Sequence, residues 1–205
     1  MVENFDPVVA AVTVYDRTAE HYQSQWDGYV TPAMERLASS LAPNALVLDA
    51  GCGPGRDLQA LVGAGLSPVG VDLSAAMCSL AATSGQPVFQ GDLRYLPFAD
   101  QTFDGVLASA SLVHLDPDTV DAALCDLARV TRSGGVMAVS VKADVEGSGY
   151  SGFEGTGENQ RWFYYWPPQV FVTHIRDCGW AVETLEVRAD TFRPISWVET
   201  LLRRV

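Results

Sequence analysis

Short apolar runs alternate with amphipathic segments along most of the chain, a rhythm that predicts a parallel α/β sheet. Glycine, proline or aspartate bounds most of the apolar runs, as expected for buried strands. The expected strands are residues 45–50, 68–73, 87–92, 103–110, 134–142, 181–189 and 196–204. Because little chain is left for a further strand–helix–strand unit, we expect the last two strands to pair antiparallel at one edge.

Apolar residues recur at helical spacing between these strands, which predicts helices that cover the sheet. The expected helices are residues 57–65, 74–85, 116–135 and 167–180. The second of them opens on Ser74, a favourable N-cap, and ends at Gly85. At 205 residues the chain is long enough for one well-buried core and short for two, so we expect a single domain.

Two segments fall outside this alternation. Residues 1–44 precede the first strand and look helical in pieces, whereas residues 45–205 hold the alternating core. Within the core, residues 143–166 join a glycine- and glutamate-rich stretch to five consecutive aromatic residues, Trp162–Trp166. Because a long loop in a compact domain is often functional, we expect residues 143–166 to form a loop or lid beside a binding pocket.

Acidic residues outnumber basic ones, 25 to 13, and the formal net charge is −12. Proteins that bind DNA, RNA or anionic membranes neutralise phosphates with lysine and arginine, and no basic run occurs in this sequence. We therefore expect no nucleic-acid and no membrane partner. No apolar run reaches membrane-spanning length, and the N-terminus lacks the basic start of a signal peptide, so we expect a cytoplasmic location.

The four cysteines are Cys52, Cys78, Cys125 and Cys178. They form no CxxC pair, and no histidine stands at zinc-finger spacing from them. We expect all four to be reduced thiols, as is usual in the cytoplasm. Histidines and carboxylates show no metal-site spacing either, so we expect no metal.

The most informative stretch is VLDAGCGPGRD, residues 47–57, in which an apolar run ends on an acid before a glycine-rich turn. A dinucleotide-binding turn reads G-x-G-x-x-G, but here Arg56 stands at the position of the third glycine. Pro54 also removes a backbone donor that a phosphate would use. The turn therefore argues against an NAD-type oxidoreductase, which stays as the less favoured alternative.

Three acids stand at the ends of consecutive strands: Asp49, Asp72 and Asp92. Ligands of parallel sheets bind beyond the carboxyl ends of the strands, so we expect these carboxylates at one rim. They would repel a pyrophosphate and suit a ligand with a cationic amine, a ribose diol and an adenine amino group. S-adenosylmethionine carries all three groups, and Asp72 lies about 20 residues past the turn, where a ribose-binding acid is expected.

Four ordered motifs occur between residues 45 and 142: VLDAGCGPGRD, VGVDLSAAM, GDLRYLPFADQTFDGVLASASLVHL and LARVTRSGGVMAVSV. Together they resemble class I S-adenosylmethionine-dependent methyltransferases, and are closest to the small bacterial members of the methyltransferase-11 type. The similarity extends weakly to VYDRTAEHYQSQW and WFYYWPPQVFVTHIRDCGWAV. It implies a Rossmann-like α/β fold with helices on both faces of a seven-stranded sheet that is parallel except for one edge strand.

The resemblance also implies which residues hold the cofactor. Asp49 would hold the methionine amine, Asp72 the ribose hydroxyls and Asp92 the adenine amine. The other expected cofactor-binding residues are Gly51, Gly53, Gly55, Arg56, Leu73, Met77, Leu93, Tyr15 and Tyr22. The glycines would let the backbone approach the methionine part, and Leu93 would pack at the adenine edge.

Several of these residues have a plainer alternative role. Leu73 and Met77 would either cover the adenine faces or belong to the ordinary core. Arg56 would either pair with a carboxylate of cofactor or substrate or stay solvated. Tyr15 and Tyr22, in the N-terminal segment, would either close over the cofactor or only pack against their neighbours.

The acceptor side is less well defined by the sequence. His114 follows the fourth expected strand, where relatives bring methyl donor and acceptor together, so it would act as a general base or as a structural histidine. Alternate rings of the aromatic run, Trp162, Tyr164 and Trp166, would line the acceptor pocket or pack at the sheet edge. The implied reaction is in-line methyl transfer to an oxygen, nitrogen or carbon of a small molecule, with S-adenosylhomocysteine as product.

Two further alternatives stay open beside the oxidoreductase. A protein of this fold can hold the cofactor without turnover, because cofactor motifs say nothing about catalysis. A methyltransferase of macromolecules is disfavoured by the acidity of the chain. A monomer and a homodimer are both compatible with the sequence.

Overall fold

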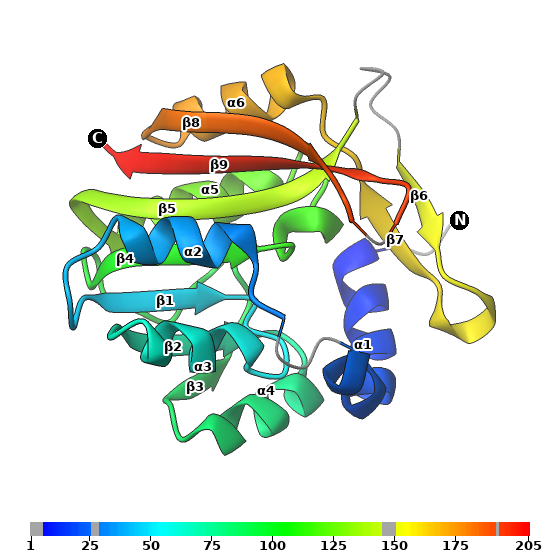
Figure 1. Cartoon of the computed structure of the whole chain (residues 1–205). Helices are drawn as coiled ribbons and strands as arrows, with labels where there is room; N and C mark the ends of the chain where they lie inside the picture. Colours follow the sequence, from blue (N-terminus) through cyan, green and yellow to red (C-terminus); the bar gives the residue numbers. More distant parts are fainter. Residues whose placement is uncertain (1–5, 26–28, 145–150, 192) are drawn as a thin grey trace.

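The computed structural model describes residues 6–25, 29–144, 151–191 and 193–205. It has a seven-stranded sheet with helices on both faces, as Figure 1 shows. The strands of this sheet are β1 (Leu46–Ala50), β2 (Ser67–Asp72), β3 (Val88–Gln90), β4 (Phe103–Ser109), β5 (Thr131–Ala143), β8 (Trp180–Ala189) and β9 (Ser196–Arg204). The α/β fold expected from the alternation is confirmed.

The strands lie in the order β3-β2-β1-β4-β5-β9-β8. β1 to β5 run parallel, and β9 is antiparallel to both β5 and β8. The last two strands therefore pair antiparallel as expected, because the short connection between them permits nothing else. The single reversed strand is next to the edge and not at it, which corrects the position implied by the resemblance.

Six α-helices accompany the sheet in the described part of the chain. They are α1 (Pro7–Gln25), α2 (Pro32–Ser39), α3 (Arg56–Gly63), α4 (Ala75–Ala81), α5 (Val120–Val130) and α6 (Pro168–Asp177). Successive strand residues point to opposite layers. Val47 and Leu107 pack with α2 and α3, whereas Leu48 and Val106 belong to the core under α5 and α6.

Two helices are shorter than their apolar spacing indicated. The end of the expected helix 74–85 is a 3₁₀ turn, residues 82–84, which Gly85 closes with a φ of 77°. The expected helix 116–135 begins only at Val120, because the Thr119 hydroxyl donates to the Asp116 carboxylate in a turn before it. It ends at Val130, where β5 begins.

The segment expected as a loop contains a hairpin. β6 (Ser151–Glu154) and β7 (Arg161–Tyr164) pair antiparallel around the 3₁₀ turn η3 (Gly157–Asn159), while residues 145–150 lie outside the described part. In Figure 1 the hairpin, in yellow, extends beside α1 at the carboxyl ends of the parallel strands. The aromatic run is thus partly a strand, which local composition alone did not reveal.

Packing of α5 against α6 brings two cysteines together. Cys125 and Cys178 form a disulfide although they are 53 residues apart, with their Cα atoms at 4.6 Å. Cys52 and Cys78 are free thiols. The expectation of four reduced thiols is therefore wrong, because sequence spacing says nothing about a pair that tertiary packing creates. None of the described helices is long and apolar enough to span a bilayer.

Candidate functional site

The glycine turn between β1 and α3 has a backbone that favours glycine. Gly51 and Gly53 have φ angles of 81° and 52°, in the left-handed region. A Cβ at Gly51 would lie 2.3 Å from the Cβ of Ser111, whereas a Cβ at Gly53 would meet nothing within 4 Å. Gly51 is therefore required by close packing, and Gly53 presents bare backbone to open space.

Asp72 ends β2 beside this turn and fixes its shape. Its Oδ2 accepts from the N–H of Gly53 and its Oδ1 from the N–H of Ser74, both at 2.9 Å. Burial raises the pKa of the Asp72 carboxyl, and the hydrogen bonds from Ser74 and Gly53 oppose that rise. Because Ser74 also caps α4 through the N–H of Met77, the carboxylate is anchored to two elements.

The other two rim acids differ in their partners. Asp49 is buried, and its Oδ2 has no hydrogen-bond partner among the described residues. Burial, with the nearby charge of Asp57, raises the pKa of Asp49 well above its usual value, and Arg56 opposes this rise. Partial burial disfavours ionisation of Asp92, but hydrogen bonds from Arg94 outweigh it and lower the pKa. Asp49 is thus the rim acid with an unsatisfied oxygen.

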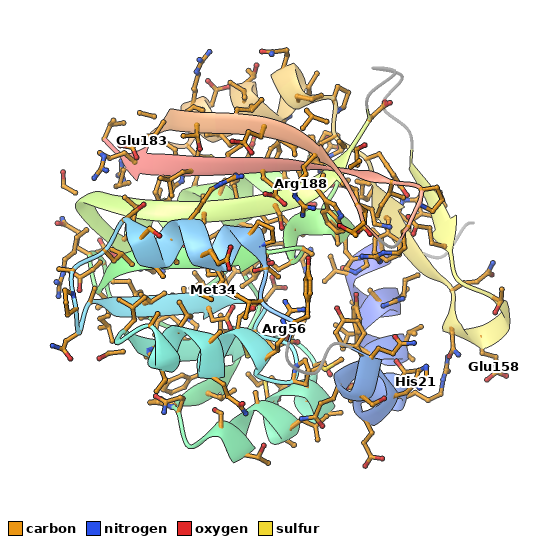
Figure 2. All side chains as sticks on the ribbon, viewed as in Figure 1. His21, Met34, Arg56, Glu158, Glu183 and Arg188 are labelled. Carbon is orange, nitrogen blue, oxygen red and sulfur yellow. A yellow bond between two sulfur atoms is a disulfide. The ribbon has the colours of Figure 1, made fainter. Side chains whose placement is uncertain are left out.

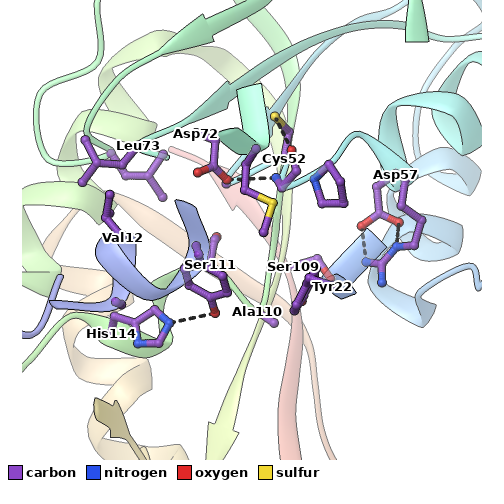
Figure 3. Close-up of a pocket in the computed structure, with 18 of the residues that line it drawn as sticks. Val12, Tyr22, Cys52, Asp57, Asp72, Leu73, Ser109, Ala110, Ser111 and His114 are labelled. Carbon is purple, nitrogen blue, oxygen red and sulfur yellow. Dashed lines mark hydrogen bonds and ion pairs between the residues drawn. The ribbon is translucent and has the colours of Figure 1, made fainter. Parts of the chain in front are cut away.

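A cavity of about 430 Å³ opens in front of the turn. Figure 3 shows Asp72 and Leu73 on one side of this space, and Ser111 and His114 on another. The expected cofactor-binding residues that line it are Gly51, Gly53, Arg56, Asp72, Leu73, Met77, Asp92, Leu93, Tyr15 and Tyr22. Asp49 and Gly55 are not part of its wall as described; Asp49 lies in β1, and Gly55 packs against Ala81.

Helix α1 forms the outer wall of this cavity and is tied down at both sides. Asp16 accepts from the hydroxyl of Ser74 at 2.5 Å and from the N–H of Ala76 at 3.1 Å, so it caps α4 from outside. Arg17 donates to the backbone of Glu158 and to Oδ1 of Asn159 at the tip of the hairpin. The N-terminal helix is therefore held between α4 and the β6–β7 hairpin.

Tyr15 and His114 form a hydrogen-bonded pair at the inner end of the cavity. The Tyr15 hydroxyl lies 3.1 Å from Nε2 of His114, and Nδ1 lies 2.6 Å from the carbonyl oxygen of Trp162. A carbonyl only accepts, so Nδ1 carries the hydrogen and Nε2 accepts from the Tyr15 hydroxyl. Burial lowers the pKa of His114 to about 4 and raises the pKa of Tyr15. Both side chains are neutral at pH 7.

A second cavity, of about 170 Å³, adjoins the first on the side of β5, β7 and β9. The residues that line both cavities are Tyr15, Tyr22, Tyr29, Arg56, Ser109 and Ala110. Ala110, directly after β4, has a φ of 54°, a conformation that non-glycine residues adopt mainly where surrounding structure enforces it. Molecules bound in the two cavities would therefore be neighbours across this shared wall.

The aromatic residues of the run 162–166 have different surroundings. Trp166 is 2% exposed and packs against Phe171, 5.3 Å away between ring centroids. Trp162 and Tyr164 line neither described cavity, although Trp162 supplies the carbonyl that orients His114. The ring of this run that faces the second cavity is Phe163.

Sequence reasoning missed several residues around the second cavity. Lys142 and Arg161 line it from β5 and β7, and Arg188 lines it from β8. Figure 2 shows Arg56 and Arg188 reaching the same region from different elements. A lysine that ends the apolar run of β5 was an available signal, since a charge at a strand end lies at the ligand-binding rim. The two arginines had no such signal, because their neighbours come from distant segments.

Comparison with known families gives one match, a methyltransferase domain over residues 48–139. The chain is 37% identical over 101 residues to demethylmenaquinone methyltransferase of Thermobifida fusca, covering 46% of this chain and 42% of that protein. It is 35% identical over 137 residues to malonyl-[acyl-carrier protein] O-methyltransferase of Pectobacterium atrosepticum, covering 65% and 51%. It is 31% identical over 139 residues to tRNA (carboxymethyluridine(34)-5-O)-methyltransferase of Arabidopsis thaliana, covering 63% and 32%.

Solved structures share the fold over nearly the whole chain. The 1,6-didemethyltoxoflavin-N1-methyltransferase of Burkholderia thailandensis, with bound 1,6-didemethyltoxoflavin and S-adenosylhomocysteine, superposes with a TM-score of 0.78 at 22% identity, covering 100% of this chain and 92% of that one. The [4+2]-cyclase SpnF superposes with a TM-score of 0.76 at 16% identity, covering 97% and 96%.

The sequence matches are therefore confined to part of each relative, since the chain spans between 32% and 51% of the three curated proteins. The matched family domain includes the glycine turn, the three strand-end regions and His114. Residues 48–139 are therefore a methyltransferase domain, and the strand order is that of the Rossmann-like α/β fold which the resemblance to class I S-adenosylmethionine-dependent methyltransferases implied.

Proposed function

We propose that this protein transfers the methyl group of S-adenosylmethionine to an oxygen, nitrogen or carbon of a small molecule. The observation that carries the proposal is the pair of cavities with a shared wall. One cavity has the carboxylates and the bare glycine backbone that suit the cofactor, and the other is smaller and is lined by several aromatic side chains. A donor and an acceptor bound in these two spaces would meet at Ser109, Ala110 and Tyr15.

The described residues fit the cofactor on two independent points. The unsatisfied Oδ2 of Asp49 is not part of the cavity wall, so we propose that it accepts from the cationic methionine amine through water. The open space above Gly53 leaves room for the methionine backbone. Asp72 would hold the ribose hydroxyls, and Asp92 and Leu93 the adenine, with Leu73 at its face. S-adenosylmethionine supplies an electrophilic methyl group on a positively charged sulfur.

Proximity is the main contribution that we assign to the protein. Holding two reactants in line replaces a bimolecular encounter and accounts for a large part of many rate enhancements. The Tyr15–His114 pair stands at the shared wall, and a proton released near the Tyr15 hydroxyl has a path to Nε2 of His114. With a pKa of about 4, His114 is a weak base, so we propose it as an assisting group and not as an obligatory one.

The alternatives are separated by specific features. A tRNA acceptor, as named for the Arabidopsis relative, is disfavoured by the net charge of −12 and by a second cavity of about 170 Å³. Cofactor binding without methyl transfer stays the alternative, since the cyclase SpnF shares the fold. Because the turn lacks the third glycine, NAD is not the expected ligand.

A binding and labelling experiment tests this proposal. S-adenosylhomocysteine should bind the purified chain in calorimetry and raise its melting temperature. A ligand concentration of 100 times the dissociation constant should add about 2.7 kcal/mol to the free energy of unfolding. NAD should neither bind nor raise the melting temperature. Transfer of label from methyl-labelled S-adenosylmethionine to a metabolite extract then separates turnover from binding alone, because a binding protein without catalysis would leave the extract unlabelled.

A further inference from the structure

Basic residues gather around the second cavity in a chain whose net charge is −12. Five of the 13 lysines and arginines line this space of about 170 Å³, against two carboxylates, Asp190 and Glu199. The five are Arg56, Lys142, Arg161, Arg188 and Arg193. What the cavity can bind depends on which of these cations already has a counter-charge.

Four of the five cations are paired with a carboxylate of the chain. The pairs are Arg56 with Asp57, Arg188 with Glu199, Arg193 with Asp190, and Lys142 with Glu154. The side chain of Lys142 is 2% exposed, and its ammonium also lies 3.6 Å from the ring centroid of Phe163. Each of these four cations is thus neutralised by a carboxylate of the chain, so none of them brings an uncompensated positive charge to the cavity.

Arg161, at the start of β7, is the exception. No carboxylate of the described chain pairs with it. Its guanidinium carbon lies 4.9 Å from the ring centroid of Tyr15 and 5.5 Å from that of Phe163, and a side-chain hydrogen bond also links it to Tyr15. Its Nε–H is buried and has no hydrogen-bond partner among the described residues. A buried charged donor without a partner destabilises a protein. Because Arg161 lines the cavity, an anion bound there would give its guanidinium the counter-charge that it lacks among the described residues.

The position of Arg161 connects this charge to the shared wall. The Tyr15 ring that it contacts lines both cavities, and the hydroxyl of Tyr15 bonds to His114. Aromatic side chains of Phe163 and Trp197 line the rest of the second cavity. The apolar part of an anion bound by Arg161 would thus contact aromatic rings, and the anion would lie next to the first cavity.

We propose that the second cavity binds a small organic acid through a salt bridge between Arg161 and the acid's carboxylate, and that the methyl acceptor is of this class. The planar guanidinium favours a carboxylate, which it can engage through two parallel hydrogen bonds. A volume of about 170 Å³, with one lining cation that no described carboxylate pairs, favours a carboxylate over a dianionic phosphate ester. The identification as acceptor rests on the proposed function; the binding of the acid does not.

Paired probes test the proposal on the full chain by protein-observed NMR titration. Benzoate, phenylacetate and 4-hydroxybenzoate are each compared with their neutral amides, with and without saturating S-adenosylhomocysteine. We expect the acids to bind at least tenfold more tightly than the amides, because a charged hydrogen bond is gained. Arg161→Gln should remove this preference. Arg132→Gln removes an arginine outside both cavities, 51% exposed and paired with Asp104, and should keep the preference.

The outcomes separate this inference from the proposed function. Equal binding of acids and amides, or a preference that survives Arg161→Gln, overturns the inference, and tighter binding of phenyl phosphate than of benzoate overturns the carboxylate. S-adenosylhomocysteine binding is measured in the same samples, and an unchanged affinity shows that Arg161→Gln is folded. Failure of that ligand to bind would contradict the proposed function, while the acid titration alone decides the present proposal.

Discussion

The two cavities carry opposite charge although they share a wall. The larger is lined by the carboxylates of Asp57, Asp72 and Asp92 and by one arginine, whereas the smaller is lined by five cations and two carboxylates. A methyl donor with a positive sulfur and a cationic amine suits the first environment, and an anionic acceptor suits the second. Under the proposed function, this difference in charge would direct the donor to the larger cavity and the acceptor to the smaller one.

The cavities also differ in how the chain builds them. Most of the inner wall of the larger cavity comes from the glycine turn and from residues directly after β2, β3 and β4. The smaller cavity draws on α1, β5, β7, β8 and β9, segments that lie far apart in sequence. A substitution should therefore disturb cofactor binding locally in the first case and substrate selection in the second.

The largest expected effect distinguishes two glycines of the same turn. Gly51→Ala should destabilise the fold by roughly 2–5 kcal/mol, because the new Cβ meets Ser111 at 2.3 Å and the backbone is left-handed. Gly53→Ala should cost only about 1–2 kcal/mol, the left-handed penalty alone, while it blocks S-adenosylhomocysteine. Denaturant unfolding and calorimetry measure the two effects. Equal loss of stability in both variants would contradict the different packing of the two positions.

Asp72 gives the next largest effect, and it concerns the cofactor cavity alone. Asp72→Ala removes a carboxylate that would accept two hydroxyl hydrogen bonds, each worth roughly 1.5–3 kcal/mol, so affinity for S-adenosylhomocysteine should fall by at least about a hundredfold. Asp72→Asn keeps one acceptor for the N–H of Gly53, and its affinity for S-adenosylhomocysteine should lie between those of the natural protein and Asp72→Ala. Asp100→Ala removes a 73% exposed acid outside both cavities and is the control. Unchanged affinity in folded Asp72→Ala would exclude the ribose role.

His114, beside the shared wall, should make the stability of the fold depend on pH. Burial, with the charges of Arg161 and Lys142, holds its pKa at about 4, against 6.5 in an unfolded chain, while the Trp162 carbonyl opposes the shift. The folded state then binds fewer protons than the unfolded state between these values. Its contribution to stability is full above pH 6.5 and is lost as pH falls towards 4, about 3 kcal/mol at most.

His114→Gln should abolish this dependence. Both proteins are unfolded with denaturant at pH 7.5 and at pH 4.5. The loss in free energy of unfolding between these two pH values should be about 2 kcal/mol smaller in the variant than in the natural chain. His174→Gln removes a histidine on α6, outside both cavities, and should retain the dependence. If natural protein and His114→Gln lose stability in parallel, the imidazole is not buried and neutral as described.

Asp16 gives the smallest expected effect, on the helix that both cavities share. Asp16→Ala removes the additional acceptor at the start of α4 while Ser74 remains the N-cap, and it should lower the free energy of unfolding by about 1 kcal/mol. Hydrogen exchange should show lost protection in α1, and affinity for S-adenosylhomocysteine should fall less than tenfold. Asp16→Asn keeps an acceptor oxygen and should recover part of the loss. Unaltered exchange in α1 would mean that Asp16 does not dock this helix.

The grouping of residues around the larger cavity was partly predictable, because the signals that place them there are local. Asp72 and Gly53 stand at strand ends and in a turn whose spacing is visible in the sequence, and the structure brings both to one wall. Asp49 carried the same signal but lies in β1 and not in the cavity wall. A strand end visible in the sequence predicts which edge of the sheet a residue is near, but it does not predict whether the side chain is buried or lines a cavity.

The second cavity was not predictable from the same reasoning. Arg161 is next to the aromatic run, but that no carboxylate of the described chain pairs with it depends on β5, β6 and α1, which meet it only in the fold. Phe163 lines the second cavity, whereas Trp166 is buried between the end of β5 and Phe171 of α6, a placement that only the packed fold determines. The Cys125–Cys178 disulfide depends likewise on the packing of α5 against α6. Contacts between distant segments have no local pattern to be found.

A crystal structure of the chain with S-adenosylhomocysteine and benzoate tests the two-cavity account most directly. The account predicts the adenosine between Asp72 and Leu93, the amine on the side of Asp49, and the sulfur directed at the wall formed by Ser109 and Ala110. It predicts the benzoate carboxylate on Arg161, across that wall. S-adenosylhomocysteine in the second cavity, or its absence beside Asp72 at saturating concentration, would contradict the account.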